Sequence, residues 1–228
     1  MAVLRDAEPA CRRLGLFLAG GYALRAHGLI DRPGRNLDFA ASCEVPLPDV
    51  AARLAEELGR AGYRVTAGEA TPRLCRLAVA EPGGGRAVEV TLLREALRAR
   101  PCRTGLGTAV GLDDAVGLKV RALHDRGLPR DLVDVAAAAR LYPYRELERL
   151  GALHDDGFSV AELLWRLDAV QQHPDEAYEA YGLAAGEIRR IRLFALGWAE
   201  EIRLRRVEDG DRPAGHLALD EAAPDEAG

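Results

Sequence analysis

The stretch LFLAGGYAL, residues 16–24, decides the fold when it is taken together with NLDFA, residues 36–40. The first stretch predicts a short buried strand, a tight turn at Gly20-Gly21 and the start of a helix. In the second stretch, strand alternation places Asp38 on the face opposite its two apolar neighbours. Glycines let a backbone approach a phosphate closely, and the helix that follows directs free N–H groups at it. A carboxylate on the next strand can hold Mg²⁺ against the same phosphates. A plain turn is the alternative for the glycines alone.

Helix and strand patterns alternate around this stretch and then give way to helices. Expected helices before residue 112 cover 7–14, 22–27 and 50–60, and expected strands cover 16–19, 37–40, 63–66, 73–80 and 87–92, with a hairpin turn at 82–85. After residue 112 we expect a helix over 116–123, with Asp113 and Asp114 as N-cap candidates, and further helices over 131–141, 144–150, 160–167, 175–181 and 185–207. The order predicts an α+β (mixed α/β) protein: a core over 1–110, a helical C-terminal domain over 111–207 and an acidic disordered tail over 208–228.

Bulk composition limits the function classes. The chain has 228 residues, 48% of them apolar, and no run of 18 apolar residues, so we expect a buried core and no membrane partner. The charged N-terminus lacks the apolar core of a signal peptide, which predicts a cytoplasmic protein. No two of the four cysteines form a CxxC pair, which favours free thiols over a zinc site.

Charge is distributed unevenly along the chain. The net charge is −5, from 31 basic and 36 acidic residues. The segment 208–228 holds seven acids and one arginine, which leaves 30 basic and 29 acidic residues in the remainder. The remainder is therefore close to neutral, and the acidic total is no argument against binding RNA.

Two single residues stand out beyond the opening stretch. Glu89 lies between two valines on an expected strand, so its carboxylate points away from them; it is either a solvated strand residue or a third acid near a metal, acting as ligand or general base. Lys119 is the only lysine among 31 basic residues. A lysine at this position is either chance or a sign that the position requires a compact ammonium in place of the planar guanidinium of arginine.

A helical hairpin brings further candidates together. Lys119 and Asp134 lie on successive expected helices joined by a short Gly-Pro loop, so the hairpin can place them side by side. Asp131 and Asp134 are three residues apart and share a helix face. The structural alternative is a salt-bridged hairpin in which Arg130 pairs with one of these acids.

In combination, the three segments resemble the AbiEii/AbiGii nucleotidyltransferase toxins, whose MenT-type members share the pattern. The resemblance spans about residues 10–140 and rests on the following residues: Gly20, Gly21, Ala23, His27, Arg32, Arg35, Asn36, Leu37, Asp38, Phe39, Lys119, Ala122, Arg126, Arg130, Asp131 and Asp134. It implies a polymerase-β-like nucleotidyltransferase core, a helical C-terminal part, a divalent metal (Mg²⁺ or Mn²⁺) and an NTP donor. For MenT-type members it also implies the tRNA 3′ end as acceptor and a cognate antitoxin protein as partner.

The resemblance and the residue patterns together give the candidate site residues. We expect Asp38, Lys119, Asp134, Asp131 and Glu89 as catalytic residues, Gly20, Gly21 and Arg35 as nucleotide-binding residues, and Asp38, Asn36 and Glu89 as metal ligands. Two arginine clusters of the last helix, at 189–192 and 203–206, could bind the RNA backbone or remain solvated.

One departure from the family pattern concerns the metal site. Asn36 replaces the usual first aspartate of the strand, and an amide oxygen is a weaker ligand for Mg²⁺ than a carboxylate. Asp38 and Glu89 could carry the metal together, the enzyme could be slower or use another metal, or the chain could bind nucleotide without catalysis. A small-molecule nucleotidyltransferase of the aminoglycoside-modifying kind is the alternative enzyme, because it would differ only in its acceptor.

Overall fold

The computed structural model describes residues 2–32, 34, 36–84 and 87–208. Its helices before residue 112 are α1 (Ala2–Leu14), α2 (Gly20–Ala26) and α3 (Leu47–Arg60). Its strands are β1 (Leu16–Leu18), β2 (Leu37–Ala41), β3 (Arg64–Ala70), β4 (Leu74–Ala80), β5 (Val88–Arg94), β6 (Cys102–Thr104) and β7 (Gly107–Ala109). The remaining helices are α4 (Leu112–Arg126), α5 (Pro129–Ala138), α6 (Tyr144–Ala152), α7 (Val160–Gln171), α8 (Glu176–Glu179) and α9 (Ala185–Glu208).

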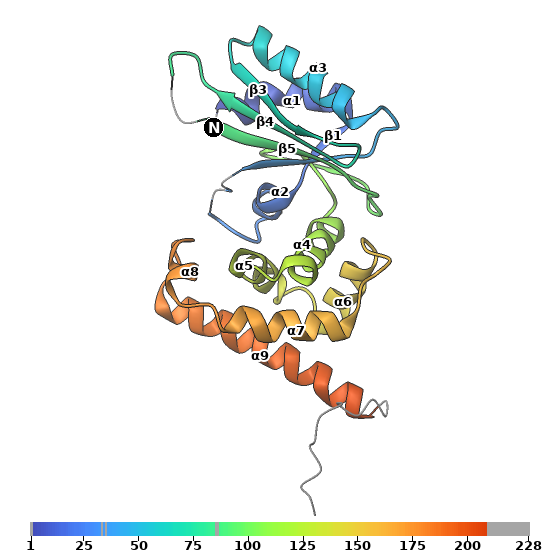
Figure 1. The fold of residues 1–228 in the computed structure, drawn as a ribbon, viewed down its shortest axis with the longest axis vertical. Helices are drawn as coiled ribbons and strands as arrows, with labels where there is room; N and C mark the ends of the chain where they lie inside the picture. The colour runs from blue at the N-terminus through green and yellow to red at the C-terminus, as the bar shows by residue number, and fades with distance from the viewer. Residues whose placement is uncertain (1, 33, 35, 85–86, 209–228) are drawn as a thin grey trace, which may run out of the picture.

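The described strands form one seven-stranded mixed sheet in the order β3-β4-β5-β2-β1-β7-β6. The pairs β2–β5 and β1–β7 are parallel, and the other neighbours are antiparallel. Helices α1 and α3 cover one face of this sheet, while α2 and the helical C-terminal part lie on the other side (Figure 1). The expected α+β class, a mixed sheet followed by a helical C-terminal part, is confirmed.

Apolar spacing explains how the sheet is covered. Helix α3 buries Leu47, Val50, Leu54 and Leu58 at intervals of three and four residues, which places them on one helix face. That face packs against β3, β4 and β5. Strand β4 alternates, with Cys75, Leu77 and Val79 buried beneath the helices, so its other side chains face away from the covered side.

Four sequence expectations differ from the structure. Gly20-Gly21 forms the first turn of α2 instead of a separate turn, since a glycine can take the positive φ of +57° found at Gly20. Gly111, not Asp113 or Asp114, occupies the N-cap of α4. Strands β6 and β7 were not expected, and α5 ends at Ala138 instead of 141. Glu208, the first residue of the predicted disordered tail, ends α9, and the rest of that tail lies outside the described residues. Residue 85 of the predicted 82–85 turn and residue 86 after it also lie outside the described residues.

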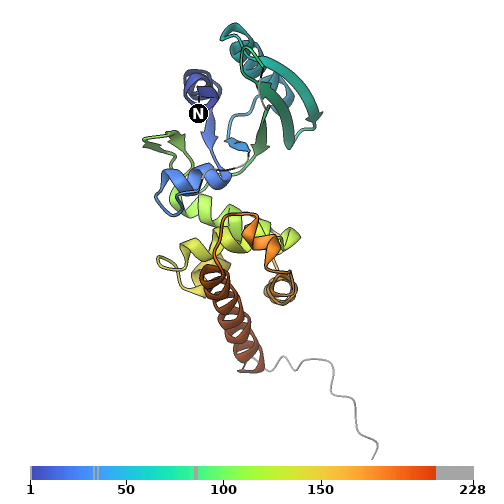
Figure 2. The ribbon, with the colours of Figure 1, turned by 90° about the vertical axis from the view of Figure 1, so that its left-hand side faces the viewer.

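The helical part packs around α4. This helix contacts α2 on the sheet side and α5, α6 and α7 on the other, and α9 packs along α7 and α5. Seen from the side, the sheet with its helices and the helical part form two layers, with α9 farthest from the sheet (Figure 2). Within the described residues, none of the helices has the length and apolar content that crossing a bilayer requires.

Candidate active site

The open face of the sheet carries its polar residues in register. Asp38 on β2 is paired with Thr91 on β5, which is paired with Arg76 on β4. Side chains of paired residues project from the same face, so these three form a polar row across the strands. Glu89 lies two residues before Thr91 on β5, so its side chain projects from the same face of the sheet. The register therefore brings Asp38 and Glu89 together although 51 positions separate them in the chain.

The Asp38 carboxylate leaves no space for a side chain at position 20. A Cβ on Gly20 would lie 2.2 Å from Asp38 Oδ2 and 2.9 Å from Asp38 Cγ, far inside van der Waals contact. The positive φ of this residue excludes a side chain on a second, independent ground. The backbone at the start of α2 is thus in close contact with the Asp38 carboxylate, whereas the approach to a phosphate that the sequence suggested for these glycines stays a prediction.

The environment of Asp38 disfavours the charged form of its carboxylate. Burial raises its pKa, while Lys119, Arg130 and Arg126 favour the charged form and Glu89 disfavours it. Among the residues that the structure describes, none donates a hydrogen bond to this carboxylate. A half-buried carboxylate without a hydrogen-bond donor among the described residues, beside a second acid, is the arrangement that a bound cation would stabilise.

Glu89 is held by the residue that departs from the family pattern. Asn36 Nδ2 donates a hydrogen bond of 2.8 Å to Glu89 Oε1. The amide nitrogen is therefore used on Glu89, and the amide oxygen of Asn36 is left for another partner. Asp38, Glu89 and the Asn36 oxygen together offer the oxygen donors that Mg²⁺ or Mn²⁺ prefers, so the residues present fit a divalent cation.

Lys119 and Asp134 meet as the hairpin predicted. Lys119 Nζ lies 2.8 Å from Asp134 Oδ2, and both side chains are largely buried, with exposed fractions of 13% and 5%. Arg32, from the segment after α2, donates to the other oxygen of the same carboxylate. Asp134 thus holds one cation from the helical part and one from the sheet side at the same point.

Asp131 takes a different position from Asp134. Its side chain is fully buried, and both of its oxygens accept hydrogen bonds of 2.8 Å from Arg126. Arg130, the partner considered in the structural alternative, approaches Asp131 only to 3.9 Å, so Arg126 is the closer partner. Asp131 does not line the cavity described next, and its position is that of a residue that orients Arg126.

These groups surround a cavity of about 350 Å³ between the open sheet face, the start of α2 and the helical part. Its lining includes Gly20, Gly21, Asn36, Asp38, Glu89, Lys119 and Asp134 from the predicted set. It also includes Arg32, Leu74, Arg76, Thr91, Leu93, Glu95, Arg121, Arg126, Arg130 and Tyr181. Six cationic side chains therefore face four acidic ones, and two of those acids are already paired: Glu95 with Arg121, and Asp134 with Lys119 and Arg32.

The sequence predicted the cavity residues that lie in recognisable motifs. It did not predict those that reach the cavity only through strand pairing and helix packing. Arg76, Glu95 and Arg121 carry no motif, and only the pairing of β4 with β5 and the packing of α4 bring them to the cavity. Arg35, expected as a nucleotide-binding residue, lies outside the described residues. His27, part of the family pattern, lies with its Nε2 2.8 Å from the carbonyl oxygen of Val110 and thus links α2 to the segment before α4.

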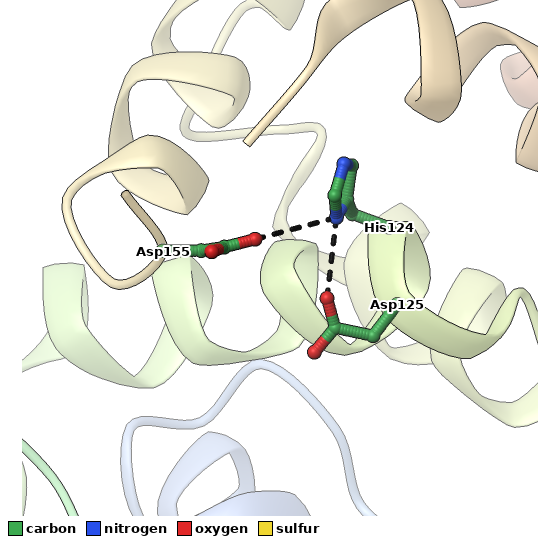
Figure 3. A group of neighbouring side chains, drawn as sticks. All are labelled: His124, Asp125 and Asp155. Carbon is green, nitrogen blue, oxygen red and sulfur yellow. Dashed lines mark hydrogen bonds and ion pairs between the residues drawn. The ribbon is translucent and has the colours of Figure 1, made fainter. Parts of the chain in front are cut away.

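A second group of possible metal ligands lies away from the cavity. The ligand atoms of His124, Asp125 and Asp155 are within 4.8 Å of one another, and Figure 3 shows both carboxylates converging on one ring nitrogen. The other nitrogen, Nε2, accepts a hydrogen bond of 3.1 Å from the Ser159 backbone N–H. The ring proton therefore lies on Nδ1, where it is donated to the carboxylates at 3.2 and 3.5 Å. With Nε2 used as an acceptor and Nδ1 as a donor, neither ring nitrogen of His124 has a lone pair left for a metal. The contact with Asp155 joins α4 to the connection between α6 and α7.

Three arginines of the two α9 clusters, Arg192, Arg203 and Arg205, are engaged within the chain. Arg192 donates to the carbonyls of Gln171 and His173 and to Asp175. Arg203 binds Asp168 at 2.7 Å, and Arg205 binds Glu148 at 2.5 and 2.9 Å. These three residues join helices of the C-terminal part, so they do not form the free RNA-binding surface considered from the sequence.

Comparisons with known proteins agree with this geometry at the level of the fold. No family model matches the chain, and no curated protein matches it in sequence. Among solved structures, it is similar to JHP933 from Helicobacter pylori, with 15% identity, a TM-score of 0.54 and coverage of 92% of this chain and 94% of that one. It is also similar to MenT4, a nucleotidyltransferase toxin from Mycobacterium tuberculosis, with 21% identity, a TM-score of 0.59 and coverage of 91% and 89%. The chain therefore has the fold of these proteins over nearly its whole length, as the sequence resemblance predicted.

Proposed function

We propose that this chain is a metal-dependent nucleotidyltransferase that transfers nucleotides from an NTP to an RNA 3′ end, with tRNA as acceptor, and that it acts as the toxin of a toxin–antitoxin pair. The observation that carries the proposal is the convergence of Gly20, Asp38 and Lys119 on one cavity. The shared fold with a nucleotidyltransferase toxin supports it.

The cavity residues divide into two groups by chemistry. Lys119, Arg126 and Arg130 supply positive charge beside the Gly20-Gly21 backbone, and a triphosphate bound there would face all three cations. Asp38 and Glu89, with the oxygen of Asn36, would hold Mg²⁺ or Mn²⁺, which neutralises charge on the phosphates and the leaving pyrophosphate. Asp134 fixes Lys119 so that its ammonium is in place before the substrate arrives.

The transfer itself requires one proton movement. The acceptor 3′-hydroxyl attacks the α-phosphorus, its proton passes to the Glu89 carboxylate, and the new O–P bond replaces the bond to the β-phosphate. Pyrophosphate leaves toward the cationic side of the cavity, where Lys119 and Arg126 stabilise its charge.

The excess of cations favours RNA over an aminoglycoside as the acceptor. An aminoglycoside is a polycation and needs acidic side chains that are free to receive it, whereas Glu95 and Asp134 are already paired and Arg76 and Arg121 line the same wall. A polyanionic acceptor is attracted by the same surface.

The experiment is incubation of the purified chain with Mg²⁺, each labelled NTP in turn, and either total tRNA or an aminoglycoside. We expect label in tRNA only, with Asp38→Ala and Lys119→Ala each lowering the rate by at least about 100-fold, as the loss of a charge-stabilising group does. Asp49→Ala, an exposed acid in the first turn of α3 on the far face of the sheet, is the matched control and should keep full activity.

Two outcomes would contradict the proposal. Activity that survives both substitutions would remove the site assignment. An inactive wild type that gains transfer through Asn36→Asp would favour the second candidate, a nucleotide-binding protein without catalysis, for which Asn36 is the supporting observation.

A further inference from the structure

The part of the cavity over β4 and β5 is not used by the triphosphate of the donor in the proposed reaction. It is lined by Leu74, Arg76, Thr91 and Leu93, while the glycines and the triphosphate cations lie on the α2 and α4 side. In a displacement at phosphorus, the attacking and leaving oxygens lie roughly in line on opposite sides. The acceptor must therefore approach from the side opposite the pyrophosphate.

The sheet register orders these residues into two parallel rows. The polar row is Asp38, Thr91 and Arg76, and the next row along the strands is Ala40, Leu93 and Leu74, here called the apolar row. Two residues along a strand separate the rows by about 7 Å, and adjacent strands are about 5 Å apart. Leu74 and Leu93 are direct cross-strand partners and remain partly exposed, so they present a continuous apolar surface to the cavity.

Arg76 is the charged residue of this surface that is least committed to the fold. Its side chain is 47% exposed, and its ion pair with Glu69 spans 3.6 Å between two exposed groups. No other partner of Arg76 occurs in the part of the chain that the structure describes. By contrast, Arg121 on the same wall is bound at both terminal nitrogens by Glu95.

We propose that this surface is the acceptor subsite: the apolar row receives the base of the last RNA nucleotide, and Arg76 binds an adjacent phosphate. An apolar surface next to a guanidinium that is held only by an exposed ion pair matches the two parts of a nucleotide, and base stacking with backbone contact is how single-stranded RNA ends are recognised. The inference rests on the proposed function and names the substrate contact of the same site.

The test measures binding of an RNA oligonucleotide that ends in a 3′-deoxynucleotide, which cannot react, to the full chain over a range of salt concentrations. For Arg76→Ala we expect affinity to fall about tenfold at moderate salt. The slope of log affinity against log salt should become shallower by about 0.7, the value for one phosphate contact on a single strand. Arg76→Lys should restore the slope. Leu74→Ala should weaken binding severalfold and leave the slope unchanged, because no charge is lost.

Steady-state kinetics separate this subsite from the donor site. Arg76→Ala should raise the KM for RNA and leave the KM for NTP unchanged, while the neighbouring exposed Arg73→Ala, which does not line the cavity, should change neither. An unchanged salt slope and RNA KM in Arg76→Ala, with an active wild type, would overturn the subsite and leave the proposed function standing. A wild type that labels no RNA would overturn both.

Discussion

At the scale of the residue, Asp38 combines a cost to stability with a role in the site. Because its folded pKa is raised above the ordinary 3.8, the folded state binds more protons than the unfolded state, and Asp38 destabilises the fold increasingly as the pH rises from the ordinary pKa through the raised one. Asp38→Asn should therefore be inactive and yet melt higher than the wild type at pH 7, by about 2–4 °C for each kcal/mol gained. The difference in Tm should vanish near pH 3, where the Asp38 carboxyl is largely protonated in both the folded and the unfolded state.

Thermal unfolding at both pH values, with and without Mg²⁺, checks this prediction. Added Mg²⁺ should raise the Tm of the wild type and not that of Asp38→Asn, because a cation that binds only the folded state stabilises it by mass action. An Asp38→Asn variant with a lower Tm at pH 7 would contradict the assignment of a carboxylate whose charge destabilises the fold.

At the scale of the element, the α4–α5 hairpin acts as one cationic unit. Asp131 fixes Arg126, and Asp134 fixes Lys119, so the two carboxylates of α5 orient two cations of α4 toward the cavity. Asp131→Asn keeps the shape and removes the charge, and it should cost about 1–3 kcal/mol of stability and raise the KM for NTP.

A double-mutant cycle with Arg126→Ala isolates this pair. If Asp131 acts through Arg126, the free energies of unfolding and the effects on KM should be strongly non-additive, with a coupling of about 1 kcal/mol or more. Additive effects would assign Asp131 a role independent of Arg126.

At the scale of the whole molecule, polar contacts join the sheet layer to the helical layer. Asp114 at the start of α4 is 1% exposed and accepts hydrogen bonds from the backbone N–H groups of Arg98 at 3.0 Å and Ala99 at 2.9 Å, beside His154 Nε2 at 3.2 Å. Asp114→Ala removes the buried acceptor of these hydrogen bonds and should cost about 2–4 kcal/mol, lowering the Tm by several degrees and the activity with it.

The neighbouring acid provides the control. Within the described part of the chain, the Asp113 side chain accepts a hydrogen bond only from the Tyr142 hydroxyl, in an exposed contact. Asp113→Ala should therefore change the free energy of unfolding by about 0.5 kcal/mol or less. Chemical denaturation of both variants compares them directly, and equal losses would show that the Asp114 contacts do not hold the layers together.

The sequence by itself determined what depends on near neighbours. The apolar runs of β1 and β2 and the spacing of α3 follow from local periodicity, and the order of segments predicted the mixed sheet with its helical C-terminal part. Gly20, Asp38 and the pairing of Lys119 with Asp134 were accessible because motif spacing and a short interhelical loop constrain them. Strands β6 and β7 were missed because three residues each, with little apolar alternation, carry too weak a local signal.

Only the tertiary structure decided which distant residues complete the site. The register of β2, β5 and β4 places Arg76, Thr91 and Leu93 beside Asp38, and a shift of one residue would turn each of them to the covered face. Packing gave Asp131 and Asp134, two acids that the sequence treats alike, different partners, because Asp131 binds Arg126 while Asp134 binds Lys119 and Arg32 at the cavity. Packing also turned Asp114 from an expected cap into a contact between layers. Such distinctions arise from pairing and packing between segments far apart in the chain, which no local pattern encodes.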